Sequence, residues 1–168
     1  MHDVSQSMIA GAIGGVAGAL AMTSVRLVGK QLGIVPESLP HKVARKVAMG
    51  AGVTELSARQ EDVFAHGQHL LLGGLYGAGY GLLHPVFNWP SGVDGPLYGL
   101  AVYGLNLGGV GPALNLTQGP WAQKPSFVGR RILVHALFGL VTALVYEKVS
   151  ESRPLMRDGE MKRVSAFV

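Results

Sequence analysis

The sequence predicts an all-α membrane protein with four transmembrane helices, and the distribution of charge is the first observation behind this prediction. Asp, Glu, Lys and Arg are absent from residues 4–25, 63–93, 95–123 and 132–146, which make up more than half of the 168 residues. A transmembrane helix needs about 20 mainly apolar residues, and three of these stretches reach that length. A water-soluble domain would carry charged side chains at shorter intervals.

Composition and glycine spacing are the second and third observations. Hydrophobic residues make up 48% of the chain, charged residues only 14%, and there are 25 glycines. A glycine inside a soluble helix costs about 1 kcal/mol relative to alanine, whereas in lipid small residues let two helices approach closely. Glycines recur at four-residue spacing in the apolar stretches, which predicts a bundle packed through glycine faces. The predicted packing residues are Gly11, Gly15, Gly73, Gly77, Gly99, Gly104, Gly108 and Gly139.

A single domain is expected over residues 1–149, followed by a charged tail of residues 150–168 without fixed structure. Four transmembrane helices fill the domain, at residues 8–28, 63–84, 95–116 and 127–149. The second helix is expected to begin ahead of its apolar part, because Ser57 and Gln60 form a capping-box pattern. Pro85 is expected to end the same helix, and Pro112 to kink the third.

The connection after the first span contains a short amphipathic helix. Ser38 and Pro40 are typical of a helix start, and residues 41–49 separate apolar from basic side chains. A helix of this kind either lies in the plane of the lipid headgroups or is a solvated surface helix. Anionic headgroups are therefore the expected partners of its three basic residues, Lys42, Arg45 and Lys46.

The second and fourth helices share a sequence pattern. Each reads His, three residues, Gly, three residues, a small residue, two residues, Tyr; the first copy runs from His69 to Tyr80 and the second from His135 to Tyr146. The pattern predicts two αα-hairpin pseudo-repeats, residues 1–89 and 90–168, in the same orientation across the membrane.

Polar side chains on these two helices are expected to face the interior of the bundle, because imidazole and phenol groups are costly against lipid tails. They are His66, His69, Tyr80, His84, His135 and Tyr146. Three roles remain open. The first is hydrogen-bonded packing between helices, and the second is a track that passes protons or a small solute. In the third, His69 and His135 ligate one haem b, with room for the macrocycle beside the following glycines.

Catalysis is not expected, since an enzyme would need a nucleophile with a positioned base or paired carboxylates. No carboxylate falls within the four uncharged stretches, which also counts against the proton track. The chain has no cysteine, so disulfides and thiolate metal sites are excluded, and neither a metal nor a cofactor is expected. The net charge of +4 does not indicate nucleic acid, because Lys and Arg flank apolar segments where lipid phosphates lie.

A glycine-rich first helix, an amphipathic connection and a second hairpin carry a set of recurring residues over about residues 8–147. These residues are His69, Gly73, Tyr76, Gly77, Tyr80, Gly81, Gly99, His135 and Gly139. In this arrangement the chain resembles the YagU-type family of small bacterial inner-membrane proteins, from which its long basic connection is a departure. The resemblance implies an inner-membrane location and adds no catalytic residue.

The sequence therefore favours a structural or accessory membrane protein, which packs with itself or with a larger membrane complex through its glycine faces. Basic residues favour the cytoplasmic side of a membrane, and most Lys and Arg side chains lie at the first and third connections. We accordingly expect residues 29–62 and 117–131 in the cytoplasm and both termini on the other side.

Overall fold

The computed structural model describes residues 4–32, 39–53, 55–87 and 89–165, and the regular structure of these residues is entirely helical, as the sequence predicts. Three long helices are α1 (Val4–Gln31), α3 (Ala58–Phe87) and α6 (Pro125–Ser165). A segmented helix consists of α4 (Ser91–Tyr103), the π-helical η1 (Gly104–Val110) and α5 (Gly111–Ala113). Two short elements complete the described chain, α2 (Leu39–Gly50) and the 3-10 turn η2 (Pro120–Ala122).

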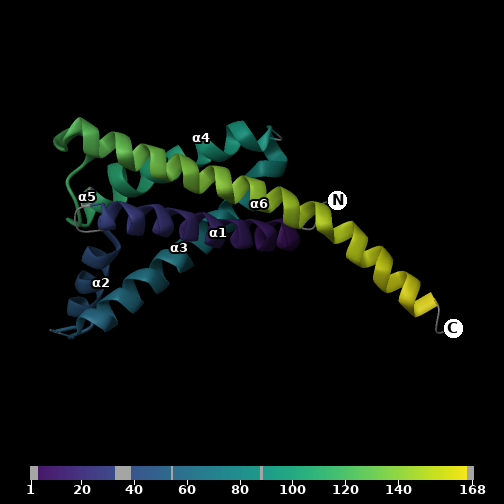
Figure 1. The fold of residues 1–168 in the computed structure, drawn as a ribbon, viewed down its shortest axis with the longest axis horizontal. Helices are drawn as coiled ribbons and strands as arrows, with labels where there is room; N and C mark the ends of the chain where they lie inside the picture. Colours follow the sequence, from purple (N-terminus) through teal and green to yellow (C-terminus); the bar gives the residue numbers. More distant parts are fainter. Residues whose placement is uncertain (1–3, 33–38, 54, 88, 166–168) are drawn as a thin grey trace.

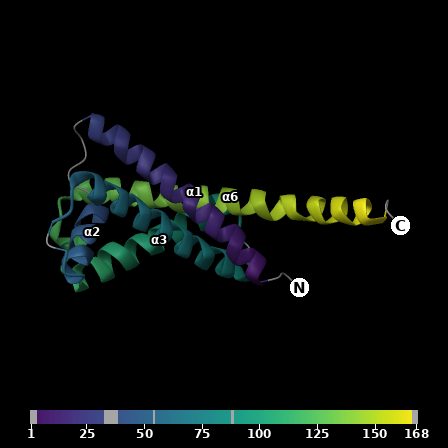
Figure 2. The same cartoon turned by 90° about the horizontal axis from the view of Figure 1, so that it is seen from below.

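Together with α6, helix α1 forms the centre of the bundle. It packs against both α3 and α6, while α4 packs against α6. Helix α2 contacts α3 and lies at the end of the bundle where α1 ends and α6 begins (Figure 1). Figure 2 shows that α1 crosses α6 obliquely and that the last turns of α6 extend beyond the other helices.

Large apolar side chains lie on the outside of this bundle and small ones on the inside. On α1, Ile13 and Leu20 are about half exposed (47% and 51%), whereas Ala10 and Ala19 are fully buried. Three helical stretches are long and apolar enough to cross a membrane: Val4–Gly29, Ala58–Phe87 and Pro125–Ser152, with mean hydropathies of 1.7, 1.2 and 1.7. An apolar exterior around a small-residue interior is typical of helices that pack in lipid. The fold is thus compatible with an integral membrane protein.

Glycines make the contacts of α1. A Cβ atom on Gly11 would collide with the carbonyl oxygen of Gly77, and one on Gly15 with that of Gly73. On another side of α1, a Cβ on Gly14 would collide with the carbonyl oxygen of Thr142 in α6. Backbone therefore touches backbone at both interfaces, because no side chain separates the helices.

The contact between α4 and α6 is equally close. A Cβ on Gly99 would collide with the carbonyl oxygen of His135, and one on Gly139 with that of Gly95. Gly104 and Gly108 differ from the other predicted packing residues, since no described atom lies within 4 Å of a Cβ added to either. These two glycines of η1 make no helix contact within the described part of the chain.

The predicted capping box at the start of α3 is confirmed. The Ser57 amide donates to Gln60 Oε1 at 3.0 Å, and the Gln60 amide donates to Ser57 Oγ at 3.3 Å. The predicted end of this helix before Pro85 is wrong, because α3 continues to Phe87. A proline in the last turn removes a single backbone donor, and the helix tolerates that loss where it is about to end.

The segmented helix, the third of the four predicted, begins at Ser91, four residues before the predicted Gly95. The Pro90 carbonyl oxygen accepts from the amides of Val93 at 2.8 Å and Asp94 at 3.1 Å, which closes the first helical turn. This shift places Asp94 inside the helix instead of in the preceding loop.

The π-helical segment η1 lies directly before Pro112, where the sequence predicts a kink. Pro112 has no amide hydrogen, and its ring would clash with the carbonyl of the residue four positions earlier in an α-helix. In the structure the Gly111 amide instead donates to the carbonyl oxygen of Asn106, five residues back. The wider turn accommodates the proline, and the helix ends at the next residue, Ala113.

The predicted tail without fixed structure is wrong up to Ser165, because α6 continues to that residue. Lys148 Nζ pairs with Glu151 Oε2 at 3.2 Å, across the three-residue spacing that supports an exposed helix. Residues 153–165 belong to the helix, and Figure 1 shows this part (yellow) projecting from the bundle.

Candidate functional site

Three polar side chains meet where α3 ends and α4 begins, and we call them the Tyr–His–Asp cluster: Tyr80, His84 and Asp94. The Tyr80 hydroxyl donates to Asp94 Oδ1 at 2.9 Å, and His84 Nδ1 lies 2.6 Å from Asp94 Oδ2. Exposed fractions are only 2% for Tyr80 and 8% for Asp94. Since both carboxylate oxygens accept, we assign the ring proton of His84 to Nδ1, which leaves the Nε2 lone pair to take up a proton.

Aromatic rings from two further positions enclose this cluster. The Tyr98 ring of α4 lies 5.3 Å from the Tyr80 ring, and the Tyr146 ring of α6 lies 5.0 Å from the His84 ring. Ser91 Oγ is buried at the same helix start and makes no hydrogen bond with described atoms. Asp94 stands in the first turn of α4, where the helix dipole favours a negative charge.

Asp94 belongs to the first turn of α4 and is buried, whereas the predicted helix began only at Gly95. The signal that would have located it is the sequence itself: Ser91 precedes an acidic residue three positions later, as at many helix starts. That pattern moves the helix start back by one turn. Asp94 then lies level with the final turns of α3, which carry Tyr80 and His84.

A second polar group, the arginine–histidine cluster, lies toward the α2 end and consists of Arg26, His66, His69, Arg131 and His135. The guanidinium of Arg26 donates to His66 Nε2 at 3.2 Å, and His66 Nδ1 lies 2.7 Å from the carbonyl oxygen of Asp62. A carbonyl only accepts, so His66 Nδ1 carries the ring proton and Nε2 accepts from Arg26.

The α6 side of the arginine–histidine cluster has a similar arrangement. His135 Nδ1 donates to the carbonyl oxygen of Arg131 at 2.7 Å, and the Tyr103 ring lies 5.2 Å from the His135 ring. Arg131 donates to Gln123 Oε1 at 3.2 Å. His69 lies between the two sides, close enough to Arg26, His66 and His135 to interact with them electrostatically.

Hydrogen-bonded groups occupy the interior between the two clusters. The Tyr76 hydroxyl donates to Asn106 Oδ1 at 2.7 Å, and Asn106 Nδ2 donates to the carbonyl oxygen of Val102 at 3.0 Å. The Tyr98 hydroxyl donates to the carbonyl oxygen of Tyr76. Polar side chains therefore recur along α3 from one cluster to the other.

The structure divides the predicted polar residues between these two places. Tyr80, His84 and Tyr146 come together at one end of the bundle, and His66, His69 and His135 at the other. Neither Asp94 nor the two arginines were among the sequence candidates.

The room that the haem alternative required beside two glycines is filled by protein. A Cβ on Gly73 would meet the side chain of Ala19 in α1, and one on Gly139 would collide with the backbone of Gly95 in α4. A flat macrocycle has no space at either position, so this alternative loses its steric basis.

Helix α2 directs its basic residues toward protein groups. Arg45 Nε donates to Glu61 Oε1 at 2.9 Å, and Lys46 Nζ donates to the carbonyl oxygen of Leu114. His41 Nε2 lies 2.7 Å from Asp62 Oδ1. The Lys42 side chain lies outside the described residues.

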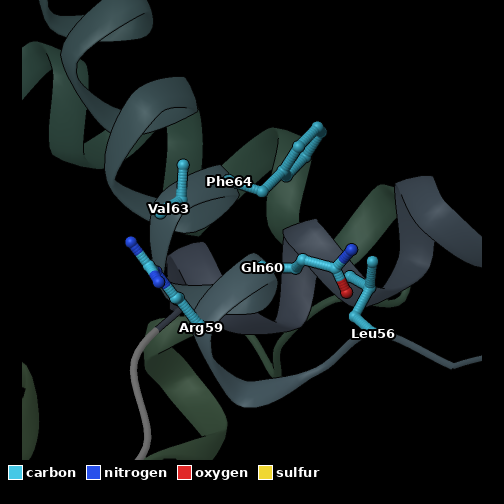
Figure 3. Close-up of a pocket in the computed structure, with 5 residues that line it drawn as sticks. All are labelled: Leu56, Arg59, Gln60, Val63 and Phe64. Carbon is cyan, nitrogen blue, oxygen red and sulfur yellow. The ribbon is translucent and has the colours of Figure 1, made fainter.

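A shallow surface depression at the start of α3 is separate from both clusters. Its lining comes from one short stretch: Leu56, Arg59, Gln60, Val63 and Phe64 (Figure 3). Four of these five side chains are exposed, and the lining provides no converging polar groups. It lacks the features of a ligand site.

Within the described ranges, no three His, Asp or Glu residues are placed to hold a metal ion. Comparisons with family models, with curated proteins and with solved structures find no match to this chain. The functional argument therefore rests on the two polar clusters themselves.

Proposed function

We propose that this protein is a four-span membrane protein that relays protons through the polar interior of its helix bundle. The observation that carries the proposal is the burial of Asp94 against Tyr80 and His84. Ionisable groups inside a membrane bundle are costly and commonly mark proton or ion pathways. With Asp94 as its counter-ion, His84 can take up a proton at Nε2, which converts the singly negative His84–Asp94 pair into a neutral one.

The proposed path follows α3 through the bundle. It begins at the arginine–histidine cluster, continues through Tyr103 and the Tyr76–Asn106 pair, and reaches the Tyr–His–Asp cluster by way of Tyr98. Direct hydrogen bonds join parts of this path, and water molecules would bridge the remaining gaps.

A fourth span through α4, η1 and α5 is part of the proposal. Residues 91–113 are long enough to cross the hydrocarbon core, roughly 30 Å at about 1.5 Å per residue. After Asp94 the next charged side chain is Lys124, beyond the end of this helix. An apolar helix of this length next to α6 is well suited to lipid.

Contacts between residues at equivalent positions of the repeated pattern support the two proposed hairpin repeats. Tyr80 and Tyr146, equivalent in the repeated pattern, have ring centroids 5.5 Å apart, and the equivalent His69 and His135 interact electrostatically. Each hairpin also has its own glycine crossing, α1 on α3 and α4 on α6. Equivalent residues thus share a depth in the bundle.

The relay is tested by proton flux into liposomes that contain the purified protein and a pH-sensitive dye, driven by a potassium gradient with valinomycin. We expect flux above that of empty liposomes and a reduction of about tenfold or more in Asp94→Asn, because loss of a positioned acid or base slows proton transfer strongly. Glu151→Gln, which removes an exposed carboxylate of α6, should leave the flux unchanged. Equal flux in the Asp94→Asn and wild-type proteins would refute the relay.

A second candidate function is an accessory role in which the bundle packs with a second copy or a larger membrane complex. Gly104 and Gly108 of η1 favour this role, because no described atom lies within 4 Å of a Cβ added to either. Gly15, in contrast, already packs against α3. Gly108→Leu should then reduce the particle mass measured by light scattering in mild detergent, and Gly67→Leu, at another open glycine, should not. An unchanged mass in Gly108→Leu would exclude this face.

Neither function involves covalent chemistry, and no enzymatic activity is proposed. An inner-membrane location is proposed on the resemblance to the YagU-type family, and the placement of residues 29–62 and 117–131 in the cytoplasm is proposed on the charge distribution. Membership of the YagU-type family stays a prediction.

A further inference from the structure

We infer that the arginine–histidine cluster is a binding site for the phosphate group of an anionic ligand. Two partly buried guanidinium groups, Arg26 of α1 and Arg131 of α6, belong to it, together with imidazoles from α3 and α6. The inference concerns the cluster at which the proposed relay begins, but it requires no proton transfer, so phosphate binding can be tested separately from proton flux.

Both arginines have neutral hydrogen-bond partners in the described structure. Arg26 donates to the imidazole of His66, and Arg131 donates to the amide of Gln123 and lies over the Phe127 ring, with its guanidinium carbon 4.2 Å from the centroid. A guanidinium inside a membrane bundle costs free energy unless it is paired. These two groups therefore lack the anion that their environment favours.

Two acidic residues of α3 in the described part of this end, Glu61 and Asp62, are engaged by α2. Glu61 accepts from Arg45, and the side chain of Asp62 pairs with His41, although its charge still acts on Arg26. Asp62 is also exposed, with 63% of its side-chain surface accessible. One screened carboxylate does not neutralise two guanidinium groups.

The helix register brings the two arginines to within one residue of the same level. In the antiparallel contact of α1 with α6, Gly14 lies against Thr142 and Gly18 against Phe138. Continuing in steps of four places Arg26 level with position 130 of α6, so that Arg131 lies one residue along the helix from that level. Both lie about 8–9 Å inside the helix ends at about 1.5 Å per residue, which is the depth at which side chains reach lipid phosphates.

Phosphate is the anion whose geometry suits this site. The planar fork of arginine donates two parallel hydrogen bonds to phosphate oxygens, which an ammonium group cannot reproduce. The shared chemistry admits two sources, the headgroup of an anionic phospholipid and a soluble phosphate. The test must separate them.

We would measure the binding of phosphatidylglycerol and phosphatidylcholine to the detergent-purified protein by native mass spectrometry, and of inorganic phosphate by calorimetry. We expect preferential binding of phosphatidylglycerol, weakened about ten- to hundredfold in Arg26→Gln and Arg131→Gln, because hydrogen bonds to charged groups are involved. Arg130→Gln is the matched control, since it removes the same charge from the adjacent, exposed position.

Three outcomes decide the inference. Loss of phosphatidylglycerol binding in the Arg26 and Arg131 variants, but not in Arg130→Gln, supports a lipid headgroup; the same pattern with inorganic phosphate supports a soluble ligand. Equal weakening in all three variants indicates general charge attraction and overturns the site. The site is also overturned if phosphatidylglycerol binds no better than phosphatidylcholine and inorganic phosphate does not bind. Should a glutamine variant unfold, Arg26→Lys keeps the charge without the fork and should still weaken binding.

Discussion

At the scale of single residues, the bundle depends on positions that have no side chain. Gly77 is the clearest case, because a Cβ there would collide with the carbonyl oxygen of Gly11 and crowd the backbone of Gly15. Dispersion contacts and close backbone approach replace the hydrophobic effect between helices in lipid. A single methyl group at this crossing therefore has to separate two helices.

We predict that Gly77→Ala destabilises the detergent-solubilised protein by about 1–3 kcal/mol, the usual cost of overpacking a tight interior. Gly67→Ala in the same helix is the matched control, since no described atom lies within 4 Å of the added Cβ. The control should be neutral or stabilise by up to about 1 kcal/mol through helix propensity. Circular dichroism during unfolding would measure both, and equal stabilities would contradict the crossing.

Residue patterns in the sequence identified the polar interior only in part. The histidine and tyrosine positions could be found because they repeat along the helices with one spacing, and side chains at such a spacing share a face. Asp94 could not be found while the helix start was placed at Gly95, and the role of Arg26 depends on a helix that is far away in sequence. Contacts between distant helices leave no local signal.

At the scale of elements, some features are determined by residues close in sequence and others by contacts between helices. The start of α3 is fixed by the local Ser57–Gln60 capping box and could be predicted. The orientation of α2 is set by contacts with α3, in which Arg45 pairs with Glu61. The amphipathic pattern therefore predicted the helix but not the protein surface that it covers.

We predict that Glu61→Arg loosens α2 from α3 and raises the hydrogen-exchange rate of the α2 amides by up to about fivefold, the factor expected for an exposed ion pair worth at most about 1 kcal/mol. The exchanged pair Arg45→Glu with Glu61→Arg should restore the slow exchange. High salt should reduce the difference between Glu61→Arg and wild type, because exposed charges are screened. Unchanged exchange in Glu61→Arg would show that α2 is held by other contacts.

At the scale of the whole molecule, the order of helices places unlike polar groups at the two ends of the bundle. The arginine–histidine cluster lies at the end occupied by α2, and the Tyr–His–Asp cluster lies where α3 ends and α4 begins (Figure 1). The two clusters face opposite sides of a membrane only if the segmented helix of residues 91–113 crosses it together with α1, α3 and α6. The connection that contains α2, residues 32–57, and the connection of residues 114–124 then lie on the same side of the membrane.

The number of crossings is open to a direct test, because the chain has no cysteine and single ones can be introduced. We predict that Gly50→Cys and Gln118→Cys resist a membrane-impermeant maleimide in intact cells, while Gly92→Cys is labelled; all three positions are exposed in the structure. With three crossings, residues 92 and 118 would lie on one side and react alike. Labelling of positions 50 and 118 without position 92 would keep four crossings but reverse the orientation. Residues 118 and 50 lie on the same side of the membrane only if the chain crosses it four times. In that case the two ends of the polar interior lie at opposite membrane surfaces.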